Sequence, residues 1–133
     1  VQVWLDAGRH RVVARLAAGD FYGESGACNR HHALFREQVK ALIARHPAWF
    51  PPVPSVGELA GGLGGMMRFT PFGGEKAKIM AACKSAFEEG VIIFYCGHGP
   101  YHVRLLPPLA VMKESDWPRV FACIEKGLAK AAG

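Results

Sequence analysis

Residues 94–112, FYCGHGPYHVRLLPPLAVM, bring one thiol and two imidazoles together in an otherwise apolar stretch. Cys96, His98 and His102 follow one another at spacings of two and four residues. Thiolate and imidazole are the ligands that zinc and copper prefer, and such a trio holds a metal when a fourth group or a water molecule completes the shell. A small metal-binding protein is therefore one hypothesis for this chain.

A structural zinc site usually draws two pairs of ligands from separate segments. The remaining candidates for a second pair are scattered residues such as His31, His32 and Cys123. His31 and His32 open a predicted helix, where we expect both imidazoles to be exposed to solvent. We therefore favour a simpler interpretation, in which residues 97–100 connect two strands and the histidines lie at the rim of this turn.

A nucleophilic cysteine is the second possibility for the same residues. An imidazolium beside Cys96 would lower the pKa of the thiol and produce a thiolate that attacks an acyl group. Such chemistry also needs a third group that orients the base and an oxyanion hole, and the sequence identifies neither. The acidic residues include no convincing carboxylate pair, and the glycines of residues 61–65 lack the spacing of a phosphate-binding loop.

Arg104 lies inside the apolar run that precedes the two prolines. A guanidinium in a strand must either point to the exposed face of its sheet or meet a carboxylate or phosphate. Both alternatives remain open at this point. Anion recognition is therefore a third kind of chemistry that the sequence permits.

Apolar periodicity and glycine or proline breaks predict the elements that position these residues. We expect a helix over 30–46, two extended pieces within 56–72, a helix over 75–89, a strand over 91–96, a further strand at 103–106, and a final helix capped by Ser115. This order predicts an α+β fold, with helices packed on one face of a small, mostly antiparallel sheet. We expect one domain over 1–133, with a poorly defined segment at 1–19.

The composition excludes several classes of protein. The chain has 133 residues and a net charge of +5, but its basic residues are spread over all segments and do not alternate with aromatic residues, so no nucleic-acid partner is predicted. No apolar run reaches the roughly 20 residues of a membrane span. Four separated cysteines without a CxxC pair favour reduced thiols, and hence a cytoplasmic location.

Three stretches carry a resemblance to a known family: ALFREQVKALIARHP, GGLGGMM, and the long run from KIMAACKSAFEEG through VRLLPPL to the last helix. Over residues 20–131 the chain resembles the C-terminal small domain of class III, fold-type I, pyridoxal-phosphate-dependent aminotransferases. The most specific part of this resemblance is the succession of a hydrophobic strand, a turn, an R-x-x-PPL ending and a capped helix. The chain departs from the family pattern at Gly61, Gly65 and Arg68.

The resemblance implies a role for Arg104, which stands where the family has an arginine that binds a substrate carboxylate or pairs with an active-site glutamate. The Schiff-base lysine, the aspartate on the pyridine nitrogen and the phosphate-binding turn belong to a large domain that this chain does not contain. We therefore expect no cofactor-binding, catalytic or metal-binding residue here. Pyridoxal phosphate is the cofactor of the full-length family.

The sequence thus predicts an isolated or truncated small domain that is inactive as a transaminase by itself, with Arg104 as its substrate-binding residue. Its expected partner is a missing large domain or a second copy of the chain. A self-associating binding module is the first alternative. A small metal-binding or thiol enzyme built on Cys96, His98 and His102 is the second.

Overall fold

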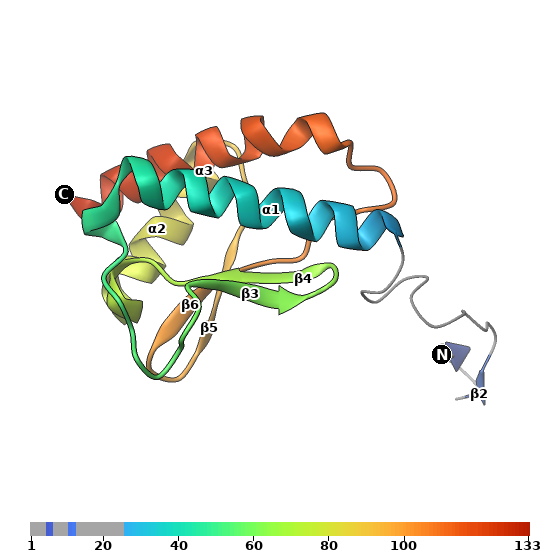
Figure 1. The fold of residues 1–133 in the computed structure, drawn as a ribbon, viewed down its shortest axis with the longest axis horizontal. Helices are drawn as coiled ribbons and strands as arrows, with labels where there is room; N and C mark the ends of the chain where they lie inside the picture. The colour runs from blue at the N-terminus through green and yellow to red at the C-terminus, as the bar shows by residue number, and fades with distance from the viewer. Residues whose placement is uncertain (1–4, 7–10, 13–25) are drawn as a thin grey trace.

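A computed structural model describes residues 26–133 and two short segments, 5–6 and 11–12 (Figure 1). Most of the predicted segment 1–19, and the predicted start of the unit at residue 20, lie outside the described residues. The helices are α1 (Gly26–Arg45), α2 (Lys76–Glu88) and α3 (Trp117–Ala132), and the strands are β1 (Leu5–Asp6), β2 (Arg11–Val12), β3 (Ala60–Leu63), β4 (Met66–Phe69), β5 (Phe94–Gly97) and β6 (Tyr101–Leu105).

Four of these strands form one sheet in the order β3-β4-β6-β5, and every neighbouring pair is antiparallel. Helices α1, α2 and α3 pack on one face of this sheet (Figure 1). The predicted α+β fold with helices on one face of a small antiparallel sheet is therefore confirmed. No helix within residues 26–133 has both the length and the apolarity of a membrane-spanning segment.

The core lies between the sheet and the helices. Met67 and Phe69 of β4 and Val103 and Leu105 of β6 are buried, because alternate residues of a strand point to the same face. The centre is an aromatic cluster in which Phe35 of α1 contacts three other phenylalanine or tryptophan rings at centroid distances of 5.9 to 6.4 Å. These rings belong to Phe69, Trp117 and Phe121.

A buried hydrogen bond joins the second turn of α1 to the first residue of α3. The indole Nε1–H of Trp117 donates to Nδ1 of His31 over 3.0 Å, and His31 is only 5% exposed. The expectation that His31 is solvent-exposed is therefore wrong. The indole N–H is buried with its ring and needs an acceptor, and Nδ1 of a neutral imidazole supplies one.

Several element boundaries also differ from the prediction. Helix α1 begins at Gly26, four residues early, and β5 begins at Phe94 rather than at residue 91. Ser115 does not cap the last helix, because it lies inside a 3-10 turn, Glu114–Asp116, that leads directly into α3. The Asp116 carboxylate instead accepts a hydrogen bond from the backbone N–H of Lys113 over 2.8 Å.

Helices α2 and α3 make the most extensive contact between any two helices, and Gly127 allows their close approach. A Cβ atom at Gly127 would lie 2.7 Å from the backbone nitrogen of Ala86 and 2.8 Å from its Cα. Backbone atoms cannot move aside as a flexible side chain can. The two helices would have to separate to accept even one methyl group.

We expect Gly127→Ala to lower the free energy of unfolding by about 1 to 3 kcal/mol, the usual cost of overpacking, although alanine favours helix more than glycine does. Urea denaturation followed by circular dichroism measures the change. Ala122 is exposed on the same helix, so Ala122→Ser serves as the control and should stay within about 0.5 kcal/mol of wild type. A stability equal to or above wild type for Gly127→Ala would show that the two helices are not tightly packed here.

Candidate functional site

The face of the sheet opposite the helices carries a row of residues that the strand register places side by side. Gly61 of β3 pairs with Arg68 of β4, Arg68 pairs with Arg104 of β6, and Arg104 pairs with Phe94 of β5. We call these four residues the arginine row. Arg68 alternates with the buried Met67 and Phe69, so its side chain points away from the core. The row therefore displays two guanidinium groups on the outer face.

Arg104 lies in this row, and no acidic side chain of the described residues forms an ion pair with it. Its guanidinium carbon is 5.6 Å from the centre of the Phe94 ring, a cation–π contact with the neighbouring strand. Its Nε is shielded from solvent and has no hydrogen-bond partner among the described residues. An N–H that is shielded from water and lacks an acceptor is unfavourable, whereas the outer Nη N–H groups of the same guanidinium can donate to an anion.

Arg68 is held over the neighbouring strand β3. Its Nη1 donates to the carbonyl oxygen of Glu58 over 3.2 Å, and its Nη2 lies 2.9 Å from the place that a Cβ on Gly61 would occupy. The Glu58 carboxylate accepts instead from Arg36 of α1 over 2.5 Å. This hydrogen bond, more than the charges of Arg36 and Arg68, holds the pKa of Glu58 below its usual value.

Two like charges at directly opposite positions in a sheet repel each other and destabilise the pair, by up to about 1 kcal/mol. Arg68 and Arg104 occupy such positions, and their side chains diverge, one toward β3 and the other toward β5. The backbone oxygen of Glu58 accepts from Arg68, but the carboxylate of Glu58 is bound to Arg36. The outer face is therefore electropositive and suited to an anion.

Sequence reasoning identified Arg104 but did not identify Arg68 as a site residue. The alternation of Arg68 with the apolar Met67 and Phe69 is a signal that could have placed it on the outer face. The partnership between the two arginines depends on the register of β4 against β6. That register joins residues 36 positions apart, and no local pattern reveals it.

The structure separates the proposed metal trio. Cys96 and His102 are direct neighbours on β5 and β6, but His98 lies in the exposed turn between these strands. His102 Nδ1 is 2.7 Å from the hydroxyl oxygen of Thr70. Within the described residues, no three potential ligands come close enough together to hold a metal ion. The interpretation of residues 97–100 as a turn between strands agrees with this geometry.

The same residues are poorly arranged for thiol chemistry. Burial, and to a smaller extent the charge of Arg68, lower the pKa of His102, so its ring is neutral near pH 7. A neutral imidazole does not provide the positive charge that activates a thiol. The nearby Cys83 is also unreactive, because burial, followed by the proximity of Cys96, raises the pKa of its thiol to about 11.

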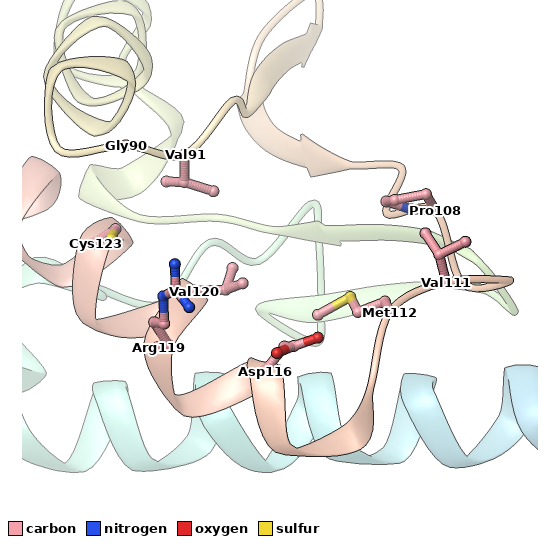
Figure 2. Close-up of a pocket in the computed structure, with 9 residues that line it drawn as sticks. All are labelled: Gly90, Val91, Pro108, Val111, Met112, Asp116, Arg119, Val120 and Cys123. Atoms are coloured by element: carbon pink, nitrogen blue, oxygen red, sulfur yellow. The ribbon is translucent and has the colours of Figure 1, made fainter.

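A shallow pocket of about 350 Å³ lies elsewhere, between α3, the residues that precede β5 and the loop that follows β6 (Figure 2). Asp116, Arg119 and Cys123 contribute its polar groups, and the rest of its lining is mostly apolar. The Asp116 carboxylate is already engaged by the N–H of Lys113. Arg104 does not line this pocket, which is therefore separate from the arginine row.

The lysines do not fit a covalent pyridoxal-phosphate site. All seven lie within residues 26–133, where six are exposed on helices or loops and Lys78 lies half-buried against the ring of Phe72. A Schiff-base lysine must lie in an enclosed site beside groups that bind the cofactor's phosphate and ring nitrogen. We therefore assign no step of a pyridoxal-phosphate reaction to residues of this chain.

No protein-family model matches the chain, and no curated protein is significantly similar to it in sequence.

Because Arg104 has no ion-pair partner within residues 26–133 and lies opposite another arginine, its replacement should stabilise the domain. We expect Arg104→Met to raise the free energy of unfolding by about 1 kcal/mol, since methionine covers Phe94 without a buried, unsatisfied N–H. Thermal and urea unfolding measure the change. The exposed Arg119, on α3, provides the matched control, because Arg119→Met should leave stability unchanged within about 0.5 kcal/mol. A clear loss of stability in Arg104→Met alone would mean that Arg104 supports the fold.

Proposed function

We propose that this chain is the small-domain unit of a class III pyridoxal-phosphate-dependent aminotransferase, in which Arg104 binds the carboxylate of a substrate, and that it has no transaminase activity by itself. The observation that supports this most is the state of Arg104 on the sheet face that the helices leave uncovered. Its Nε is buried without an acceptor among the described residues. A carboxylate is the anion whose two oxygens best match the guanidinium fork.

The surroundings of Arg104 also suit an amino or oxo acid. The Phe94 ring holds the guanidinium on one side, and the exposed side chains of Met66 and Leu106 offer apolar surface nearby. A carboxylate bound to Arg104 would leave the rest of the molecule free to extend above the sheet. The residues that would carry out the transamination belong, in this proposal, to a large domain that covers the same face.

A missing large domain is the partner that this proposal requires. The exposed apolar side chains on the sheet face support it, because such a surface is typical of an interface. No disulfide joins any of the described cysteines, which supports a reducing, cytoplasmic compartment.

The test is a titration of the protein with sodium butyrate, monitored by amide chemical shifts in nuclear magnetic resonance spectra. We expect saturable shifts at residues of β4, β5 and β6, with a millimolar dissociation constant. Arg104→Met should weaken binding at least tenfold, because a hydrogen bond to a charged group contributes about 1.5 to 3 kcal/mol. Arg119→Met serves as the control of equal charge change and should bind as wild type does.

Pyridoxal phosphate is titrated separately and should produce no aldimine absorption band. Butyrate binding that is absent, or that persists unchanged in Arg104→Met, would contradict the proposal. An aldimine band that one lysine substitution removes would contradict the claim that the chain lacks a cofactor lysine.

Self-association is the second candidate function, and a row of exposed apolar residues on the sheet face favours it. Leu63 and Met66 pair across β3 and β4, and they are 69% and 51% exposed, while Leu106, which follows β6, is 51% exposed. We call Leu63, Met66 and Leu106 the apolar row. It runs beside the arginine row and would become buried if two copies of the chain met face to face.

If the chain is such a module, sedimentation velocity should detect a dimer at micromolar concentrations, and Leu106→Glu should convert it to a monomer. Phe87 provides the control. Its side chain is 65% exposed, as an interface residue would be, but it belongs to α2, which packs on the other face of the sheet. Phe87→Glu should leave the dimer intact. A wild-type protein that is monomeric up to millimolar concentration would rule out this function.

A further inference from the structure

We infer that Arg68 is a second anion-binding residue beside Arg104, and that the two together select a ligand with two separate anionic groups. This inference rests on the proposed function, because it assigns a partner to Arg104 in binding the same ligand. It adds a residue that lies at a position where the chain departs from the aminotransferase pattern.

The first support is the register of the sheet. Arg68 and Arg104 are directly opposite each other on adjacent antiparallel strands, and both side chains point to the face without helices. Two such positions lie about 4.5 to 5.5 Å apart at their Cα atoms. A small molecule on this face is therefore within reach of both side chains at once.

The second support is that each guanidinium is held in place. Arg68 is anchored by the Glu58 carbonyl oxygen and lies in space that the absent side chain of Gly61 leaves free. Arg104 is anchored by the Phe94 ring. A binding site that is already ordered loses less conformational entropy when the ligand arrives.

The third support is the charge of the row. Arg36 neutralises Glu58, so neither Arg68 nor Arg104 has a carboxylate of its own in the part of the chain that is described. His102, on the same face, is neutral near pH 7, because burial and Arg68 both lower its pKa. Among the described residues, the charges of Arg68 and Arg104 are therefore both uncompensated, which matches a ligand with two negative charges.

Because the two arginine side chains diverge, they favour a ligand with two separated anionic groups over a single compact dianion. Arg68 extends over β3 and Arg104 extends toward β5, so their guanidinium groups lie on opposite sides of the central strands. One compact anion cannot make bidentate hydrogen bonds with both. A ligand with two carboxylates joined by a short aliphatic chain can place one carboxylate at each guanidinium. Its aliphatic chain would then lie across β4 and β6 beside Met66.

Succinate and butyrate are the probes that test this inference, because both have four carbons in a chain and they differ by one carboxylate. We expect wild-type protein at low ionic strength to bind succinate at least tenfold more tightly than butyrate, as measured by isothermal titration calorimetry and by amide chemical shifts. In Arg68→Met the two affinities should become equal within about threefold, with butyrate binding nearly unchanged.

Two further variants separate position from charge. Gly61→Ala keeps every charge but places a methyl group 2.9 Å from Nη2 of Arg68, so the guanidinium must move, and we expect the preference for succinate to fall at least threefold. Arg119→Met removes one positive charge far from the row, and the preference should remain. Thermal unfolding confirms that each variant is folded.

Each result has a distinct meaning. Equal binding of succinate and butyrate by wild type, or a preference that survives in Arg68→Met, would overturn the inference while leaving the role of Arg104 intact. A preference lost equally in Arg119→Met would show that overall charge, not Arg68, is responsible, and would also overturn it. Failure of both probes to bind wild type would instead contradict the proposed function itself.

Discussion

Two guanidinium groups lie at directly opposite positions of an antiparallel sheet, and no carboxylate of the described residues neutralises them. The register of β4 against β6 brings Arg68 and Arg104 together on the face that the helices do not cover. This arrangement destabilises the folded domain, because like charges repel and the Nε of Arg104 lacks an acceptor among the described residues. An arrangement that costs stability on an exposed face is more readily explained by binding than by folding.

The rest of the structure tolerates this arrangement because the core on the other face is well packed. Phe35, Phe69, Trp117 and Phe121 form an aromatic centre between the sheet and two helices. The hydrogen bond from Trp117 to His31 links the start of α3 to the second turn of α1, and Gly127 lets α2 approach α3 closely. With three helices on one face, the strands have an apolar side, which folds the domain, and an outer side, which remains available to a ligand or a partner.

Much of this fold could be predicted from the sequence, because its helices and strands have clear apolar periods and are separated by glycines and prolines. The helix ends were less predictable, since Asp116 rather than Ser115 supports the turn before α3. His31 was misjudged for a similar reason. Its acceptor role depends on Trp117, 86 residues away, and only the packed structure reveals that contact.

The candidate site could be predicted in part. Arg104 stood out as a charge within an apolar strand, but its relation to Arg68 required the register of two strands. Cys96, His98 and His102 are close neighbours in sequence. In the structure, however, His98 lies in the turn between the two strands that carry Cys96 and His102. Short spacing brings side chains together on a helix, whereas in a hairpin the pairing of strands decides which residues meet.

The guanidinium of Arg104 reports directly on whether the outer sheet face binds anions. Nuclear magnetic resonance can resolve the Nε–H group of each arginine, so Arg104 can be followed individually. The spectra are recorded with and without butyrate. We expect the Arg104 Nε–H resonance to shift and to exchange more slowly with water when butyrate is added, while that of Arg119 does not change. An Arg104 resonance that stays unchanged at saturating butyrate would show that this face does not bind carboxylates through Arg104.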